Sequence, residues 1–349
     1  MTNKPTIRDV AKHANVSPAT VSYVLNGVKK VSDKTKIRVL EAIEQLGYYP
    51  DFTAVSLSKR KSNLIGIMLP LTDDMPDNAT ASVLKNNLYY NEFISGVEMV
   101  AREQQFDTLL TGVADQEECR KWVKKRNLDG LIFLGIFPKS IFEQMSKLGI
   151  PIVLIDTYEE YTKLFNNVQI DDELGGYLAA NHLIKLGHKN IAFVSTNLNL
   201  SPVDTKRFTG FKKALNEAGL EVNNHLLFET REITFENGME IAEKILNENK
   251  ELTGIVTVSD ILAIGMIKAF QYHQKHVPND FSIVGFDDLS ISQFTTPSLT
   301  TIKQDIFKKG EKAAELLMNN IGDQGVERQI IELPVQLVVR ESTKKIVSN

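Results

Sequence analysis

The chain opens with three short helical patterns. Apolar residues recur on one face of the first two, at Ile7, Val10 and Ala11, then Ala14 and Val16 in a tight turn, then Val21, Val24 and Leu25. Ser17 suits the N-cap of the second helix, and Pro18 suits its first turn, where a missing N–H costs nothing. A third helix is predicted from Ser32 to Gly47, with a buried stripe at Ile37, Leu40, Ile43 and Leu46.

The second helix carries a polar face that its packing leaves free. This face holds Ser17, Pro18, Ala19, Thr20, Ser22, Tyr23 and Asn26. The pattern is typical of a helix-turn-helix unit, whose second helix enters the major groove of DNA by its N-terminal end. Because Pro18 and Ala19 are small, base reading should fall on Thr20, Ser22 and Tyr23 and on DNA shape. A purely structural bundle is the alternative, but about sixty residues with so little apolar surface make a poor domain for packing alone.

From Leu64 onward, short apolar runs alternate with helical segments. Buried parallel strands are predicted at 64–70, 108–113, 130–135 and 151–156, and a second series at 190–195, 226–230, 254–259 and 282–287. Helices are predicted between them at 93–105, 117–125, 141–148, 207–218, 237–247 and 262–274. This alternation predicts an α/β core of two doubly wound parallel-sheet subdomains, with a cleft at the C-terminal ends of the strands.

The segment from 50 to 63 joins the two patterns. Pro50 and a polar, basic end mark it as a linker, while Ala54 and Leu57 permit one or two helical turns. A helix this short is not stable alone, so we expect it to order only on DNA. Packing of Leu57 on the core is the alternative.

Charge is divided unevenly along the chain. Residues 1–62 hold eleven Lys and Arg against five Asp and Glu, a net of +6, whereas the whole 349-residue chain is −4, so the rest carries −10. This contrast is expected when one end meets phosphates and the other does not. Because +6 is modest for DNA affinity, we expect two copies to bind together.

The remaining composition limits the class of protein. No run approaches eighteen apolar residues, and the first ten residues lack an apolar signal core, so we expect a cytoplasmic protein with no membrane partner. The single cysteine, Cys119, excludes an internal disulfide and is expected to be an inert helix residue.

Signals of catalysis are missing from the sequence. There is no G-x-G-x-x-G after the first strand, no P-loop, no G-x-S-x-G and no metal-ligand spacing beyond His273 and His276, which are expected at a solvated helix end. The tandem acids 171–172 and 287–288 could serve acid/base chemistry, but carboxylates beside strand ends equally accept ligand hydroxyls or cap helices. We therefore predict no enzyme activity, no cofactor and no metal site.

Specific motifs give the chain a family resemblance. "TIRDVAKHANVSPATVSYVLNG" and "LGYYPDFTAVSLSKRKSN" resemble the headpiece of the LacI/GalR family of bacterial transcription regulators. Further motifs match in order, among them "YYNEFISGVE", "LGHKNIAFVS", "RFTGFKKAL", "VPNDFSIVGFDD" and "LTTIKQD". The resemblance covers nearly the whole chain.

The resemblance implies a domain organisation. It implies a headpiece at 1–49, a hinge at 50–63 and a periplasmic-binding-protein-like core at 64–349, with a first subdomain at about 64–164 plus 303–325 and a second at about 165–302 plus 326–349. The helix at 306–320 then belongs to the first subdomain. In such proteins, paired hinge helices enter the minor groove and a leucine matching Leu57 wedges between base pairs. The implied DNA contacts are Thr6, the polar face of the second helix, Ala54 and Leu57.

Matching motifs also place candidate effector contacts. These are Tyr89, Tyr90, Asp156, Arg207, Phe235, Ser259, Asp260 and Asp287. Arg207 is the strongest candidate, because a guanidinium fork binds hydroxyls, a phosphate or a carboxylate. Three alternatives stay open: Asp172 and Asp260 cap helices, only one of the two tyrosines faces the cleft, and Arg207 pairs with Asp287 when the cleft is empty.

Together these observations predict a homodimeric regulator, most simply a repressor. It should bind a pseudo-palindromic double-stranded DNA operator under the control of a small effector, a sugar or related metabolite, bound in the core cleft. The alternatives are a small-molecule-binding protein, or a cleft enzyme, with a fused DNA-binding domain. The long acidic stretch 71–88 is either a lid on this cleft or a surface loop.

Overall fold

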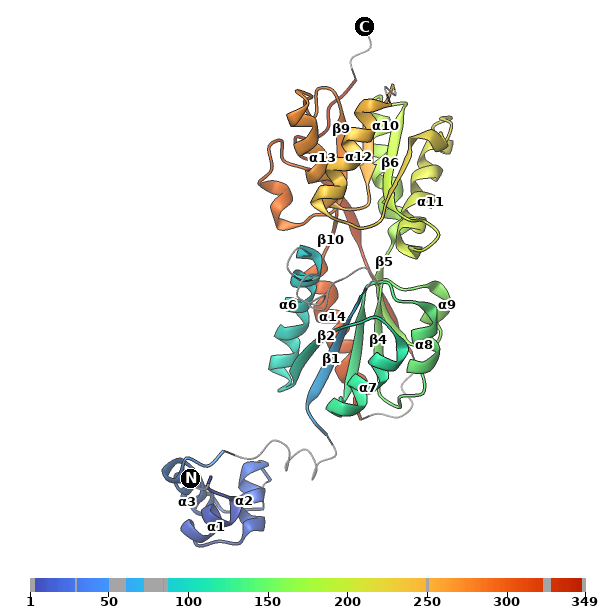
Figure 1. Ribbon diagram of the computed structural model, residues 1–349. Helices are drawn as coiled ribbons and strands as arrows, with labels where there is room; N and C mark the ends of the chain where they lie inside the picture. Colours follow the sequence, from blue (N-terminus) through green and yellow to red (C-terminus); the bar gives the residue numbers. More distant parts are fainter. Residues whose placement is uncertain are drawn as a thin grey trace. The chain divides into compact units, whose positions relative to one another are not determined.

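The chain divides into two compact units, residues 1–63 and 64–349 (Figure 1). A computed structural model describes residues 4–28, 30–49, 61–71, 84, 87–248, 251–322 and 328–346. The predicted DNA contacts Ala54 and Leu57, and most of the acidic stretch 71–88, lie outside these ranges.

The first unit is built on three helices, α1 (Ile7–His13), α2 (Pro18–Leu25) and α3 (Asp33–Leu46). Ser17 caps α2 as predicted, accepting a hydrogen bond from the backbone N–H of Thr20 at 3.1 Å. Ser32 likewise caps α3, and Gly47 ends it in the left-handed region at φ +58°. The core of this unit comes from one face of each helix, including Val10, Ala11, Val21, Val24, Val39 and Ala42.

The buried stripe predicted for the third helix was wrong in part. Ile37 and Leu40 are 56% and 47% exposed, whereas Val39 and Ala42 are buried. A helix turns about 100° per residue, so positions spaced strictly by three drift about 60° at each step and leave the packed face. Spacings of three and four, as in 39, 42, 43 and 46, stay on it.

The second unit contains two six-stranded sheets. The first has the order β11-β5-β4-β3-β1-β2 and is parallel throughout: β1 (Leu64–Pro70), β2 (Asp107–Val113), β3 (Gly130–Leu134), β4 (Ile152–Ile155), β5 (Asn166–Ile170) and β11 (Ile330–Leu333). The second has the order β12-β10-β9-β8-β6-β7: β6 (Ile191–Thr196), β7 (Leu227–Thr230), β8 (Gly254–Thr257), β9 (Ser282–Asp287), β10 (Thr300–Gln304) and β12 (Val335–Val338). Only β12 in that sheet runs antiparallel to its neighbour.

Helices cover both faces of each sheet, which confirms the predicted doubly wound architecture. On the first sheet, α6 (Leu88–Glu103) and α14 (Ile306–Asn320) lie on one face, and α7 (Gln116–Arg126) and α8 (Lys139–Met145) on the other, with α9 (Glu159–Thr162) nearby (Figure 1). On the second, α10 (Asp172–Lys185) and α11 (Pro202–Glu217) lie opposite α12 (Phe235–Asn247) and α13 (Asp260–Tyr272). The described residues also include two short 3-10 turns, η1 (Asn224–Leu226) and η2 (Ser290–Gln293).

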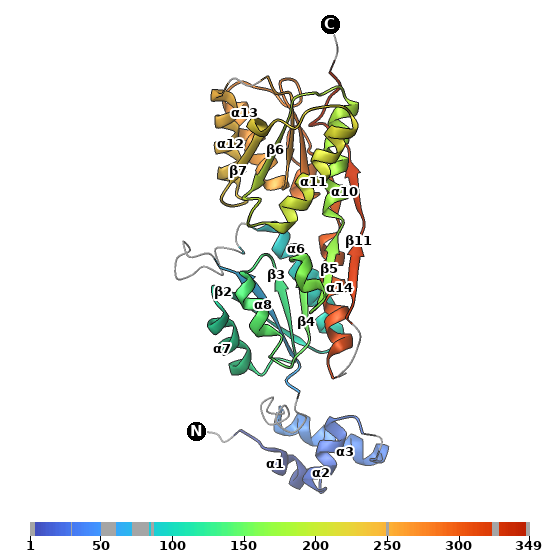
Figure 2. The same ribbon diagram turned by 90° about the vertical axis from the view of Figure 1, so that its right-hand side faces the viewer.

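The chain passes between the sheets at points that differ from the predicted subdomain boundaries. Strands β5 and β11, which the predicted division gave to the second subdomain, pair side by side in the first sheet (Figure 2). The crossings therefore follow Ile170, Gln304 and Leu333. Neither of these two strands was predicted, and the apolar pattern of a strand does not show which sheet it joins.

Apolar clusters fill both faces of the first sheet and surround the second. Cys119 is fully buried on α7, against the sulfurs of Met68 and Met145. Burial raises the pKa of its thiol to about 12, so little reactive thiolate forms.

No described helix is both long enough and apolar enough to cross a membrane.

Candidate functional site

The headpiece presents the predicted reading face of α2. Ser17, Pro18 and Ala19 are exposed at its start, and the Tyr23 ring is 43% exposed. Asn26 folds back on the helix, its amide donating to the carbonyl oxygen of Ser22 at 2.8 Å. Thr6 begins α1, where its backbone N–H and its hydroxyl both donate to Asp9 at 2.7 Å. Tyr23 is thus the longest side chain on this face, and its hydroxyl has no protein partner among the described residues.

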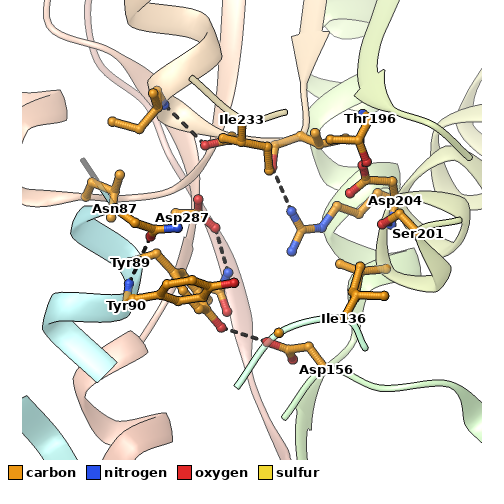
Figure 3. Close-up of a pocket in the computed structure, with 18 of the residues that line it drawn as sticks. Asn87, Tyr89, Tyr90, Ile136, Asp156, Thr196, Ser201, Asp204, Ile233 and Asp287 are labelled. Carbon is orange, nitrogen blue, oxygen red and sulfur yellow. Dashed lines mark hydrogen bonds between the residues drawn. The ribbon is translucent and has the colours of Figure 1, made fainter. Parts of the chain in front are cut away.

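A cavity of about 270 Å³ lies between the two sheets of the core (Figure 3). Its volume is just below the ~300–1,000 Å³ usual for drug-sized ligands, so it suits a compact ligand. Its lining comes from both subdomains: Pro70, Asn87, Tyr89, Tyr90, Gly135, Ile136 and Asp156 from the first, and Thr196, Ser201, Val203, Asp204, Arg207, Ile233, Val258, Ser259, Ile261, Asp287, Leu289 and Gln304 from the second.

Six of the eight predicted effector residues line this cavity: Tyr89, Tyr90, Asp156, Arg207, Ser259 and Asp287. Both tyrosines do so, with ring centroids 6.0 Å apart and edge to face, so the expectation that only one could face the cleft was wrong. Phe235 is not in the lining, because it already forms the first turn of α12, and Ile233 takes the place in the preceding loop.

Asp260 is also not among the residues that line the cavity, and its role is structural instead. Its carboxylate accepts hydrogen bonds from the hydroxyls of Ser292 and Thr301 and from the backbone N–H of Leu289. Burial, and then the nearby charge of Asp287, raise the pKa of Asp260 to about 8. The cap of α13 is Ser259, which accepts from the N–H of Ile261, so the alternative that Asp260 caps this helix is also wrong.

The side chain of Arg207 lines the cavity and is held in place by contacts with the protein. Its Nε donates to Asp172 at 2.8 Å, its Nη1 donates to the Val258 carbonyl at 2.7 Å, and its guanidinium lies 3.6 Å from the centre of the Phe286 ring. The predicted pairing of Arg207 with Asp287 is therefore wrong. Asp172 is available for Arg207 because Asp171, one residue earlier, caps α10 by accepting from the N–H of Leu174.

Close helix packing sets the position of Arg207. A Cβ on Gly176 of α10 would lie 1.9 Å from the carbonyl oxygen of Arg207, and one on Gly210 of α11 would lie 1.8 Å from that of Glu173. Only glycine allows the two backbones to approach this closely. The approach brings the Arg207 side chain within reach of Asp172.

The first subdomain contributes a buried ion pair that the sequence interpretation missed. Lys309 of α14 has no exposed surface, and its ammonium lies 2.9 Å from both carboxylate oxygens of Asp156. The Tyr89 hydroxyl donates to the same carboxylate at 2.6 Å (Figure 3). Lys309 was overlooked because "IFKKGEKAAELL" reads as an ordinary amphipathic helix, in which lysines are expected to face solvent.

Gln304 connects this ion pair to the second subdomain. Its amide oxygen accepts from Lys309 at 2.6 Å, and its amide nitrogen donates to Asp287 at 2.6 Å. Since an ammonium only donates and a carboxylate only accepts, these partners fix the orientation of the amide. Burial raises the pKa of Asp287 to about 7, despite the opposing charge of Arg207.

Comparisons with known proteins find a matching family for each of the two units. Residues 6–51 match the model described as bacterial regulatory proteins, lacI family, and residues 180–343 match a periplasmic binding protein-like domain. Catabolite control protein A of Priestia megaterium is 35% identical over 345 residues, which cover 97% of this chain and 99% of the relative. The chain belongs to the LacI family. It is accordingly a DNA-binding transcriptional regulator and not an enzyme.

Other LacI-family proteins extend the comparison. The transcriptional repressor PurR of Mannheimia succiniciproducens is 34% identical over 354 residues, covering 98% of this chain and 99% of the relative. A lac repressor dimer bound to operator and an anti-inducer has a TM-score of 0.83 at 26% identity, covering 98% of this chain and all of the other. A LacI-family regulator from Enterococcus faecium with bound ribose has a TM-score of 0.70 at 29% identity, covering 81% of this chain and all of the other.

Proposed function

We propose that this LacI-family regulator is a homodimeric repressor whose affinity for a pseudo-palindromic operator is set by a sugar-like effector in the core cleft. The observation that carries the proposal is the convergence of polar side chains from both subdomains on one cavity: Tyr89 and Asp156 on one side, Arg207 and Asp287 on the other. A ligand that touches both subdomains binds one degree of closure better than another, and this difference shifts the equilibrium.

The similar proteins support the class of ligand and partner. Solved relatives hold ribose, and one is a regulator–cellobiose complex with a TM-score of 0.72 at 25% identity. The lac repressor structure is a dimer on operator DNA. We propose the same assembly here, acting in the cytoplasm, where the operator lies.

We propose that DNA is read by two elements. The exposed start of α2 enters the major groove, with Thr20, Ser22 and Tyr23 facing base edges and Thr6, Ser17 and Asn26 near phosphates. The hinge at 50–63 orders in the minor groove, where Leu57 wedges between base pairs. A change in subdomain closure alters the separation of the two hinges in the dimer. This separation determines whether the hinges can form ordered helices on DNA.

The experiment starts from an operator obtained by in vitro selection with the full chain. Ribose and cellobiose are the first probes for an effect on operator affinity, followed by other mono- and disaccharides. Arg207→Ala and Asp287→Ala should abolish the response of operator binding to the active sugar while leaving a folded dimer that still binds operator. A ligand that no longer prefers one closure state cannot shift the equilibrium at any concentration.

Asp107→Asn is the matched control, because Asp107 is an exposed carboxylate at the start of β2 and is not in the cavity lining. It should respond to the sugar as the wild type does. If Arg207→Ala loses dimerisation or folding, or if it stays folded and still responds to the sugar, the residue is structural and the site has been misplaced.

A further inference from the structure

The polar atoms that face the cleft are dominated by acceptors. Asp156, Asp204 and Asp287 line the cavity, against Arg207 as its one cationic lining residue among those described. Directly behind them lie Asp172, paired with Arg207, and Lys309, paired with Asp156. With all groups ionised, these four carboxylates and two cations carry a net charge of −2.

Two of the five N–H groups of the Arg207 guanidinium are engaged by the protein. Its Nε and Nη1 donate to Asp172 and to the Val258 carbonyl, and among the described residues only Nη2 lacks a protein acceptor. Arginine binds a phosphate or carboxylate most strongly when two of its parallel N–H groups donate to the anion. Here Asp172 already occupies one donor of the Nε–Nη2 edge, so that edge cannot bind a second anion with two parallel bonds, and the ion pair with Asp172 already offsets the guanidinium charge.

The two cavity carboxylates of the second subdomain each keep an oxygen free. Asp204 uses Oδ2 to accept from the backbone N–H and the hydroxyl of Thr196, and Asp287 uses Oδ1 to accept from Gln304. No hydrogen bond from a described residue reaches Asp204 Oδ1 or Asp287 Oδ2. Both residues line the cavity and are nearly buried, at 3% and 6% exposure, so bulk water has little access to these oxygens.

The charge of Lys309 is not accessible to a ligand. It is completely buried, and Asp156, Gln304 and Tyr89 surround its ammonium. Its effect is to neutralise Asp156, so that the first subdomain presents the two tyrosine rings and a compensated carboxylate. An anion that enters the cleft therefore meets Asp204 and Asp287, and the only cation lining the cavity among the described residues, Arg207, is already paired with Asp172.

We propose that the effector is a compact polyol that presents hydroxyl or ammonium donors to Asp204 and Asp287 and carries no acidic group, so that phosphorylated and carboxylated sugars are rejected. This inference rests on the proposed function and narrows its ligand class. Neutral and amino sugars share the required chemistry, since both donate hydrogen bonds to carboxylates. The cavity volume of about 270 Å³ favours a monosaccharide.

The test uses matched sets of ligands with the full chain at pH 8. One set is D-glucose, D-glucosamine, D-glucuronate and D-glucose 6-phosphate, and the others are the corresponding sets built on galactose, mannose and ribose. Affinity is measured by calorimetry and thermal shift. In at least one set the neutral or amino sugar should bind about 100-fold more tightly than its acidic partners. Comparison of the neutral with the amino sugar shows which donor the site prefers.

Two variants test the cause of the discrimination. In Asp204→Asn and Asp287→Asn, the preference for the neutral or amino sugar over the sugar phosphate of the same set should fall about 10-fold, because a repelling charge is removed. Asp107→Asn should keep the wild-type ratio. An unchanged ratio in both cleft variants would show that shape rather than charge excludes the phosphate.

Three outcomes overturn the inference. They are tighter binding of any phosphorylated or carboxylated sugar than of its parent, an unchanged ratio in the variants, and a lack of binding by every neutral and amino sugar at millimolar concentration. Failure of the proposed function looks different: a sugar binds the cleft, but operator affinity does not change.

Discussion

Lys309 and Asp156 form an ion pair in which one partner is sealed from water and the other borders the cleft. The lysine side chain is 0% exposed and the aspartate side chain 14%. The pair joins α14, which follows the chain's second crossing, to the loop after β4. Because the two partners differ in burial, loss of one should not cost the same as loss of the other.

Asp156→Asn should therefore destabilise the core more than Lys309→Met. The first change leaves a sealed ammonium without its counter-charge, at a cost of about 3–5 kcal/mol, whereas the second leaves a carboxylate that water in the cleft can reach. Urea unfolding measures both. Lys312→Met on the same helix breaks only the exposed pair with Glu315 and should cost under about 1 kcal/mol. Equal losses for the three variants would contradict the role given to Lys309.

The stability of the ligand-free core should fall as pH rises. Burial raises the pKa values of Asp172, Asp287 and Asp260 to about 6, 7 and 8. A folded-state pKa above the unfolded value contributes stability that is complete below the unfolded pKa and is lost as pH rises through the folded pKa. The melting temperature should thus decrease from pH 7 to pH 9, above the range in which the lowered pKa values of His182 and His188 add stability as pH rises.

Asp260→Asn isolates one part of this dependence. The variant should show a flatter decrease between pH 7 and pH 9 than the wild type, since it removes one of the groups that ionise in that interval. Asp107→Asn should follow the wild-type curve. A variant curve parallel to the wild type would mean that Asp260 does not titrate in this range.

Gly176→Ala tests the close packing that positions Arg207. Its new methyl would lie 1.9 Å from a backbone oxygen, so α10 must move away from α11, and the loss should exceed about 3 kcal/mol. Gly149→Ala is the control: its methyl meets open space, and it bears only the left-handed backbone cost of about 1–2 kcal/mol. Chemical denaturation gives both values, and similar losses would argue against a packing role for Gly176.

Tyr23→Ala should change the base preference at one position of each half-site, at a cost of about 1–3 kcal/mol there. The reason is the exposure of this side chain on the reading face of α2. Selection from randomised DNA, followed by sequencing, compares the preference profiles. If the profile is unchanged, Tyr23 does not contact bases.

Leu57→Ala should weaken specific operator binding by a few kcal/mol and leave non-specific binding nearly unchanged, because only the specific complex gains from the wedged, kinked duplex. Operator and random duplexes are titrated at two salt concentrations. Equal losses on both would exclude intercalation by this residue.

The sequence by itself determined most of the elements and six of the residues that line the cavity, but it did not reveal the strands β5, β10, β11 and β12 or the helix α10. The periods of its apolar residues specify helices and buried strands, since these follow from which faces of a local segment avoid water. Ser17 and Ser32 as caps and the buried Cys119 are likewise local or nearly local properties. Tyr89, Tyr90, Arg207 and Asp287 could be placed at the cleft because motifs mark the ends of the strands and the starts of the helices.

Only the tertiary structure decided which groups meet. The sheet that β5 and β11 join, the partner of Arg207 and the burial of Lys309 depend on pairings across 35 to 163 residues of chain. A lysine in an amphipathic helix has the same local pattern whether it faces water or a carboxylate. Its environment is set by the strand ends and loops that pack against it, and no spacing within the helix records them.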